Sequence, residues 1–518
     1  VVHEGLSERL GAVFESFGWN LIILKYGKLQ KEAFDEPGGN LLKKWIDDCP
    51  NQLYSALIYE GGSTFKQRIL DDIGDQDIVS ELINKRTDSE FLDLMANLGG
   101  HCVQTLIKVF EKVKDDKPTA FIAYTIKGWG TPLAGHKDNH AGLMTKAQMN
   151  SFKLKYGISD GNEWNRFSDE KNNVELDKYI KNLPFQKAKH RKFQSKKVSI
   201  DENVFINETK ISTQNAFGKI LDQYAKNNTD FSRRILTTSP DVSVSTNLGP
   251  WINRKGLFSR KDSSDTFKDR KIPSAQKWIF SSQGQHIELG IAEMNLFLML
   301  GAAGLSHEFF GERLFPIGTV YDPFISRGLD AMNYTCYQDA RFMIVGTPSG
   351  ISLAPEGGAH QSIGTPLIGI SQPGLLSFEP AFADELALIM NYGFNYLQDE
   401  AGGSIYLRLT TRSIDQPIRE IDNELKNNII RGGYWLKKPG SNPEVIIVYQ
   451  GAVAIEAIES TALLGEKFKN SGVLSITSSD KLFHEWKNQN IISHIELLLE
   501  CVPKDTRIIT VIDGHPMT

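Results

Sequence analysis

Short runs of β-branched and other apolar residues alternate with amphipathic segments along most of this 518-residue chain. Several runs are apolar at nearly every position, which is typical of parallel strands that are buried on both faces. We predict strands within residues 19–26, 119–128, 233–241, 313–321, 340–347, 404–411, 444–451, 472–479 and 506–513. We predict helices between them, among others at residues 6–18, 102–116, 383–398 and 452–468. The alternation predicts an α/β protein with successive doubly wound parallel sheets.

The composition narrows the class of protein. With 40% hydrophobic and 23% charged residues, the chain has enough apolar side chains for a large core, so intrinsic disorder is excluded. A net charge of −5 gives no general attraction to nucleic acid or to an anionic membrane. No apolar run approaches the roughly 18 residues that a membrane span requires. The four cysteines form no CxxC pair, so we expect a reducing, cytoplasmic location.

Two polar segments divide the chain. Residues 184–212 are rich in Lys and Arg and favour a solvated linker over a nucleic-acid patch, because the chain as a whole is acidic. Residues 416–433 separate two apparent sheets. We therefore predict domains at 1–200, 205–425 and 430–518. The chain opens without Met and closes on a strand that runs into a loop, so we expect a piece of a longer chain whose last domain is truncated.

A glycine-rich loop with two histidines follows the second predicted strand, in "YTIKGWGTPLAGHKDNHAGLMT" (124–145). Ligands of open α/β sheets bind beyond the carboxyl ends of strands, and glycine lets the backbone approach them closely. His136, Lys137 and His140 are therefore candidates for anion binding or proton transfer. The alternative is a mobile surface loop whose histidines are incidental.

Two further segments follow strands in the middle of the chain. "TPSGISLAPEGGAHQSIGTP" (347–366) offers His360 and Glu356 after a buried strand, in a site or in an ordinary loop. In "GTVYDPFISRG" (318–328), Tyr321 and Phe324 are three residues apart. Their spacing fits core packing, and it also fits a wall on which a flat heteroaromatic ring stacks.

The segment "GIAEMN" (290–295) places Glu293 in a run that is otherwise almost entirely apolar. A buried carboxylate is costly unless it is paired. Glu293 is either a carboxylate in the first turn of a helix, where its charge interacts favourably with the helix dipole, or a functional acid. The pattern alone does not separate these two interpretations.

These pieces, in this order, resemble the thiamine-diphosphate-dependent enzymes of the transketolase superfamily. "GIAEMN" is similar to the segment with the glutamate that activates the cofactor, and residues 124–145 resemble the loop that closes over it. "ESFGWNLIILKYG", "MANLGGH", "FEPAFADELALIM" and "IIRGGYWL" resemble the homodimeric decarboxylating component of the pyruvate dehydrogenase complex. This second resemblance spans nearly the whole chain.

The resemblance implies a role for each candidate residue. Glu293 hydrogen-bonds a ring nitrogen of the aminopyrimidine, and Tyr321 and Phe324 stack on that ring. His360 and His140 bind substrate oxygens and move protons, and His136 assists in the closing loop. Two further residues are implied near the cofactor: His101, from its "GGH" context, and Asp241, which matches an acid of transketolases. The pyruvate dehydrogenase pattern has a second acid where this chain has Val242.

One motif of the superfamily is missing. Its Gly-Asp-Gly segment, followed by an Asn, holds the Mg²⁺ ion of the cofactor through hard oxygen ligands. "SDGNEWN" (159–165) has neither the preceding strand nor the spacing. The family carries this motif just upstream of the position of residue 1, so we expect no metal ligand in this chain. We expect the chain by itself to bind thiamine diphosphate poorly or not at all, and to be inactive.

The resemblance implies decarboxylation of a 2-oxo acid, pyruvate, and transfer of the two-carbon unit to a lipoyl-bearing acyltransferase component. It implies a homodimer whose sites combine the first domain of one subunit with the second domain of the other. One alternative is a transketolase, in which Arg408 and Arg412 of "LRLTTR" bind sugar phosphates rather than form structural ion pairs. Another is a non-catalytic relative that serves as an assembly platform. We expect neither a nucleic-acid nor a membrane partner.

Overall fold

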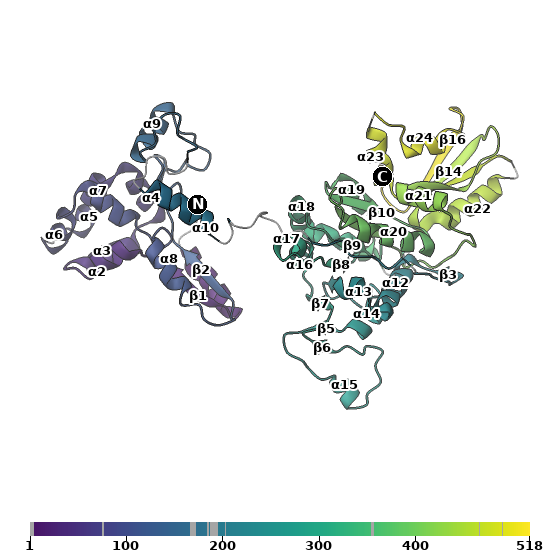
Figure 1. Ribbon diagram of the computed structural model, residues 1–518, viewed down its shortest axis with the longest axis horizontal. Helices are drawn as coiled ribbons and strands as arrows, with labels where there is room; N and C mark the ends of the chain where they lie inside the picture. The colour runs from purple at the N-terminus through teal and green to yellow at the C-terminus, as the bar shows by residue number, and fades with distance from the viewer. Residues whose placement is uncertain are drawn as a thin grey trace. The chain divides into compact units, whose positions relative to one another are not determined.

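The computed structural model describes residues 5–74, 77–165, 172–183, 186, 195–202, 204–353, 357–465, 467–488 and 490–518. Contacts divide the chain into two compact units, residues 1–188 and 189–518, which Figure 1 shows in ribbon form. Glu356 and much of the predicted linker at 184–212 lie outside the described residues. The division into three domains, at 1–200, 205–425 and 430–518, stays a prediction.

The first unit is mostly helical. Its elements are α1 (Leu6–Ser16), β1 (Asn20–Leu24), α2 (Lys28–Phe34), α3 (Gly39–Asp48), α4 (Asn51–Glu60), α5 (Gly62–Ile73), α6 (Asp77–Asn84), α7 (Asp88–Ala96), α8 (Val103–Phe110), β2 (Thr119–Ala123), α9 (Lys146–Lys155) and α10 (Asn173–Asn182).

Strands β1 and β2 pair in parallel, with Asn20 opposite Thr119 and Leu24 opposite Ala123. Seven helices in succession, α2 to α8, separate them in the sequence. We predicted no strand between residues 27 and 118, and the alternation of strands and helices does not extend to this stretch. Helices α2 to α7 bury apolar stripes against one another, around Phe65 and Phe91. Helix α8 packs on the two strands instead, with Phe110 against Phe121 of β2.

The second unit carries the larger sheets. Its elements are β3 (Lys210–Ile211), α12 (Thr213–Asn227), α13 (Asp230–Arg234), β4 (Ile235–Ser239), α14 (Gly249–Lys255), β5 (Leu257–Phe258), α15 (Thr266–Asp269), β6 (Phe280–Ser281), β7 (His286–Glu288), α16 (Glu293–Gly304), α17 (Ser306–Phe309), β8 (Phe315–Val320), η1 (Asp322–Gly328), α18 (Leu329–Tyr337), β9 (Met343–Gly346), η3 (Gly358–His360), α19 (Thr365–Ser371), β10 (Leu375–Phe378), α20 (Ala383–Tyr396), β11 (Ser404–Arg408), β12 (Ile414–Asp415), α21 (Asn423–Arg431), β13 (Gly433–Lys437), β14 (Val445–Gln450), η4 (Gly451–Val453), α22 (Ala454–Leu464), β15 (Gly472–Ile476), α23 (Ser479–Lys487), α24 (His494–Leu499) and β16 (Arg507–Ile512).

An eight-stranded sheet, in the order β10-β11-β9-β8-β4-β7-β5-β6, forms the centre of this unit, and all its neighbouring strands run parallel. Successive side chains of a strand point to opposite faces. Accordingly, Met343 and Val345 of β9 join the core under α12 and α20, while Ile344 joins the core under α16 and α18. Both faces of the sheet are buried, which confirms the α/β fold predicted from the continuous apolar runs.

A four-stranded sheet, in the order β13-β15-β14-β16, follows in the chain. Residues 477–480, after β15, cover the open edge of β10. The amide of Glu379 donates to the carbonyl of Thr477 at 2.8 Å, and the amide of Ser377 donates to the Asp480 carboxylate at 2.8 Å. The hydroxyl of Ser478 donates to the carbonyl of Ser377 at 2.6 Å. The two sheets are thus joined through hydrogen bonds that an edge strand would otherwise lack.

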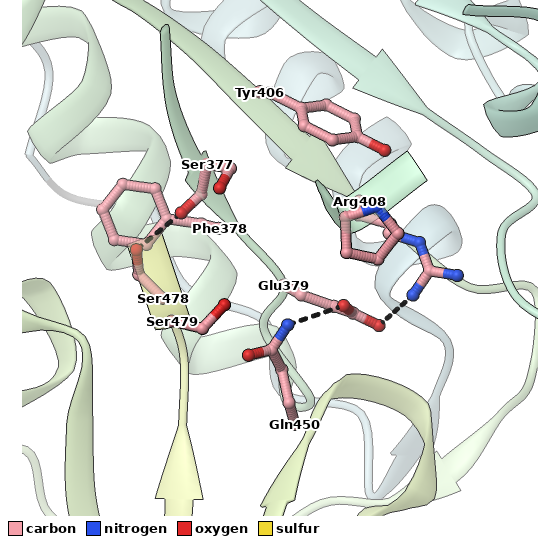
Figure 2. A pocket seen from close by; sticks show the side chains of 9 residues that line it. Ser377, Phe378, Glu379, Tyr406, Arg408, Gln450, Ser478 and Ser479 are labelled. Carbon is pink, nitrogen blue, oxygen red and sulfur yellow. Dashed lines mark hydrogen bonds and ion pairs between the residues drawn. The ribbon is translucent and has the colours of Figure 1, made fainter. Parts of the chain in front are cut away.

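Polar side chains between the two sheets surround a small cavity, shown in Figure 2. Arg408, at the end of β11, donates from Nη1 to Glu379 at 2.5 Å, and Gln450 of β14 donates to the other oxygen of Glu379 at 2.9 Å. Arg408 also donates from Nε to Asp322 at 3.1 Å. All four side chains are buried, so this cluster is a charged and fully hydrogen-bonded part of the interior.

Each of the nine predicted strand segments contains a strand. Strands β3, β5, β6, β7, β10, β12 and β13 were not predicted. Five of them, β3, β5, β6, β7 and β12, have only two or three residues, which is too short to show a periodicity. Among the residues that the structure describes, no helix is long and apolar enough to cross a bilayer.

Candidate active site

Glu293 is the first residue of α16, directly beyond the strand end at β7. Its side chain is buried, with about a tenth of its surface exposed. Oε1 of Glu293 accepts a hydrogen bond from Nη1 of Arg327 at 2.7 Å. The carboxylate is therefore held by an arginine from η1, and α16 shows no side-chain cap at its N-cap residue, Ala292.

Three rings lie next to this ion pair. The guanidinium of Arg327 stacks on the ring of Phe324, 3.6 Å from its centroid. The ring centroid of Phe324 is 5.7 Å from that of Tyr321 and 5.9 Å from that of His360, and Tyr321 and His360 meet edge to face at 5.0 Å. All three rings are half-buried, and Phe324 also packs against the core under α16 and α18. The structure brings Glu293, Tyr321, Phe324 and His360 together around Arg327.

Asp241 follows β4 and has a positive φ of 63°. Its side chain is exposed, and its amide donates to Oε1 of Glu288 at 2.7 Å. The same turn reaches the aromatic cluster, because the hydroxyl of Tyr321 donates to Ser245 at 2.8 Å. Asp241 therefore lies at the same strand-end edge as the cluster.

Glu288 fixes this turn. Burial alone would raise the pKa of Glu288, but hydrogen bonds from His286, Ser243 and the amide of Asp241 outweigh it and hold the pKa at about 2. The hydroxyl of Ser243 also lies 3.0 Å from Nε2 of His286, and Thr237 lies 2.9 Å from Nδ1. A charged carboxylate thus anchors the segment that carries Asp241 and Ser245.

Replacing Glu288 with Gln is expected to lower stability at neutral pH, because an amide cannot accept all of these hydrogen bonds. The folded-state pKa of Glu288 is about 2 and its ordinary value is 4.5. The stabilisation is therefore fully present above the ordinary value and is lost as the pH falls through about 2. Denaturation curves recorded over this range should converge for the two proteins in acid. Glu420→Gln, at an exposed site, should show no such convergence.

In the first unit, His101 contacts the base of the glycine-rich loop. Its Nε2 accepts the amide hydrogen of Ile126 at 2.7 Å, and its ring stacks on Trp129 with centroids 4.5 Å apart at 13°. Burial lowers the pKa of His101, so the ring is neutral at physiological pH and carries its proton on Nδ1.

His136 and His140 lie further along the same loop. The ring of His136 packs on Tyr59 of α4 at 4.6 Å, and its Nδ1 accepts the amide hydrogen of Asp138 at 3.1 Å. His140 is exposed. The side-chain amide of Asn139 donates to the carbonyl of Lys127 at 2.7 Å, which ties the tip of the loop to its start. The loop is thus ordered by its own hydrogen bonds, and His101 and His136 both face neighbouring rings.

The two arginines suggested as sugar-phosphate ligands form ion pairs instead. Arg408 is 2% exposed and bonds Asp322 and Glu379. Arg412 pairs with Glu456 and donates to the carbonyl of Ala452 at 3.3 Å. Both guanidinium groups are thus engaged by carboxylates, which weakens the alternative in which they bind sugar phosphates.

Sequence reasoning missed Arg327, Ser245 and Glu288. Arg327 is three residues after Phe324, one turn along a helical segment, and this spacing was available as a signal. Glu288 and His286 are two apart on a strand and so share a face, which was a weaker signal. Ser245 carries no recognisable pattern. Within the described ranges no group of three or more His, Cys, Asp or Glu side chains has the geometry to hold a metal ion.

Several known proteins are similar to this chain. Residues 198–417 match the family described as the pyruvate dehydrogenase E1 component middle domain. The chain is 23% identical over 506 residues to the pyruvate dehydrogenase E1 component of Escherichia coli (strain K12), covering 91% of this chain and 55% of that protein. The Pseudomonas aeruginosa protein of the same name is 23% identical over 504 residues, covering 92% of this chain and 55% of that protein.

The chain is thus similar to pyruvate dehydrogenase E1 components over 91–92% of its length, and its middle part matches the family of their middle domain. It spans about half the length of the curated relatives it matches. Solved transketolases share the fold. The Campylobacter jejuni enzyme has a TM-score of 0.56 at 17% identity, with 79% of this chain and 58% of that chain covered. The Leishmania mexicana enzyme has a TM-score of 0.57 at 16% identity, with 80% and 58% covered.

Proposed function

We propose that this chain is part of a thiamine-diphosphate-dependent enzyme that decarboxylates pyruvate and passes the two-carbon unit to a lipoyl group on an acyltransferase partner. The observation that carries the proposal is the convergence of Glu293, Arg327, Phe324, Tyr321 and His360 at one edge of a parallel sheet. The matched relatives are named pyruvate dehydrogenase E1 components, which supports the choice of reaction.

The residues fit the aminopyrimidine end of the cofactor. The half-buried rings of Tyr321 and Phe324 offer apolar surface to a flat heteroaromatic ring. Arg327 engages Oε1 of Glu293, so we assign Oε2 to a hydrogen bond with a ring nitrogen, where the carboxyl group holds or releases a proton. The cofactor, when bound, supplies the electron sink that loss of carbon dioxide from a 2-oxo acid needs. Ligands for its Mg²⁺ are proposed to lie outside the described residues.

His360 is proposed to bind the carboxylate or carbonyl oxygen of the substrate. Its ring meets Tyr321 edge to face and lies beside Phe324, so it borders the ring-stacking surface. His101, His136 and His140 are proposed to complete the site from the first unit of a second subunit. Asp241 is proposed as a cofactor-proximal acid on the turn that Glu288 anchors. A cytoplasmic location is proposed, supported by free thiols at Cys102, Cys336 and Cys501.

A homodimer is proposed because a site that combines the second unit of one subunit with the first unit of another needs two chains. Helix α16 is apolar almost all round, and such helices are normally covered on every side. Yet Met294 and Leu298 are 41% and 57% exposed, and Tyr334 and Tyr337 of the neighbouring α18 are 62% and 84% exposed. This apolar face, directly after Glu293, is the surface we assign to the second subunit.

Leu298→Asp is expected to shift the dimer towards monomer, because a charge would be buried in the proposed interface. Sedimentation velocity across a concentration series measures the shift. Leu463→Asp, at a 74% exposed position on α22, is the matched control and should leave the assembly unchanged. An unchanged assembly in both variants would contradict the assignment of this face.

The proposed activity is tested with the whole product of the gene, supplied with thiamine diphosphate and Mg²⁺. We expect pyruvate-dependent reduction of an artificial electron acceptor. Turnover with a ketose phosphate donor and none with pyruvate would replace this proposal with two-carbon transfer between sugar phosphates. Turnover with neither donor would favour the non-catalytic assembly relative.

A further inference from the structure

Segment 513–515, which follows β16 in the four-stranded sheet, contacts both ends of the loop that carries His360. We call the described residues 350–353 and 357–363 the His360 loop. Its two ends are hydrogen-bonded to each other, because the amide of Gly350 donates to the hydroxyl of Ser362 at 3.0 Å and the amide of Ser362 donates to the carbonyl of Gly350 at 3.1 Å.

The carboxylate of Asp513 holds the first end. Oδ1 accepts the amide hydrogen of Ile351 at 2.8 Å, and Oδ2 accepts the hydroxyl hydrogen of Ser352 at 2.6 Å. The amide of Ser352 lies 3.3 Å from both oxygens. Asp513 is 3% exposed, so these bonds are made away from bulk water and are of the stronger, charge-assisted kind.

The approach at this end is close. Gly350 has a φ of +78°, and a Cβ built on it would lie 1.9 Å from Oδ2 of Asp513. Only glycine fits both the left-handed backbone and the space. The Asp513 carboxylate is thus in close contact with the backbone of the His360 loop at Gly350.

The second end and the base are held as well. The amide of His515 donates to the carbonyl of Ile363 at 2.9 Å. Arg408 donates from Nη2 to the carbonyl of Asp513 at 2.8 Å and from Nε to Asp322 at 3.1 Å. Asp322 also accepts the hydroxyl hydrogen of Ser362 and lies between Tyr321 and Phe324 in the sequence. One hydrogen-bonded cluster therefore connects segment 513–515, the His360 loop and the aromatic wall.

We propose that Asp513 is a positioning residue of the candidate active site: it holds the His360 loop so that the His360 ring stays against Tyr321 and Phe324. This inference deepens the proposed function and rests on it for the role of His360. It gives the segment that follows the four-stranded sheet a part in the site, through its hydrogen bonds to the His360 loop.

The test compares the chain with its Asp513→Ala and Asp513→Asn variants. Hydrogen exchange at the amides of Ile351 and Ser352 should accelerate by about 10- to 100-fold, the range expected for lost hydrogen bonds to a charged group. The Cε1–H resonance of His360, which the neighbouring rings shift, should move towards that of a solvent-exposed histidine. In the whole gene product, kcat/KM for pyruvate should fall by about 10- to 100-fold, mostly through a higher KM.

Asp480→Asn is the matched control. Asp480 is also a buried carboxylate of the C-terminal part, and it accepts the amide hydrogen of Ser377 from the eight-stranded sheet. It therefore reports general loosening between the two sheets. We expect it to leave the exchange of Ile351 and the His360 resonance unchanged.

If the Asp513 variants fail to fold, Ser352→Ala removes one of the bonds with little change in volume and should shift both readouts in the same direction by less. Unchanged exchange at 350–353, or equal effects of Asp480→Asn, would overturn the proposal. The hydrogen-exchange and resonance readouts do not need turnover. Absence of pyruvate decarboxylation would therefore reject the proposed function and not the positioning role of Asp513.

Discussion

Glu293→Gln is expected to lower the pyruvate-dependent activity of the whole gene product by about 10²- to 10⁴-fold, the usual contribution of a side chain that exchanges a proton with the reacting group. Gln keeps an oxygen that accepts the hydrogen bond from Arg327, so the local packing should survive. The substitution removes the carboxylate that is proposed to hydrogen-bond a ring nitrogen of the cofactor. Steady-state rates at saturating thiamine diphosphate, with denaturation curves for both proteins, measure the two effects separately.

The control for this prediction is Glu424→Gln, an exposed glutamate in the first turn of α21. If Glu293 served only the helix dipole, both substitutions would cost a few tenths of a kcal/mol of stability and neither would affect the rate. Activity of Glu293→Gln within about threefold of the parent would remove it from the proton-transfer role. Its pairing with Arg327 would then be structural.

Arg408→Met is expected to destabilise the second unit by about 3–5 kcal/mol, the usual cost of removing one member of a buried ion pair. The substitution leaves Asp322 and Glu379 buried without their guanidinium. Burial raises the pKa of Glu379, and Arg408 opposes that rise. Without Arg408 the folded protein should bind protons more readily than the unfolded chain, so the loss should be larger at about pH 8 than at about pH 5.

Arg412→Met is the matched control for this experiment. Arg412 follows the same strand and pairs with Glu456, but the two side chains are 32% and 45% exposed. Such a pair contributes at most about 1 kcal/mol. Denaturant titrations of the three proteins at the two pH values measure the difference. Equal losses in the two variants would contradict the buried-pair argument.

Much of the fold was predictable from local pattern. Strand β8 (Phe315–Val320) is buried at all six positions, as its unbroken apolar run indicated. The helical stretch between β1 and β2 was not predictable as a domain of its own, because amphipathic helices do not reveal whether a sheet or other helices cover them. The half-exposed pair β1 and β2 is likewise a two-stranded sheet where larger sheets were expected.

Some residues of the candidate site could likewise be predicted from the sequence, and others could not. Glu293, Tyr321, Phe324 and His360 were identifiable because each follows a strand or opens a helix, where side chains of a parallel sheet converge. Whether Tyr321 and Phe324 were core or wall was left open, and their half-buried state favours a wall. The part of Arg327 was not predicted, although its position in η1, three residues after Phe324, was a usable signal.

Nine of the strands, the parallel α/β class and the residue types at the strand ends could be predicted, since these depend on spacing within a few residues. Which of those residues meet depends on the packing of the folded chain. Asp513 and Ile351 are 162 positions apart, yet they share a hydrogen bond of 2.8 Å. From the sequence, Arg408 was either a sugar-phosphate ligand or a member of a structural ion pair, and it lies 2% exposed between two carboxylates. Contacts of this kind depend on how whole sheets dock, and that packing is settled by the sum of many distant interactions rather than by any local pattern.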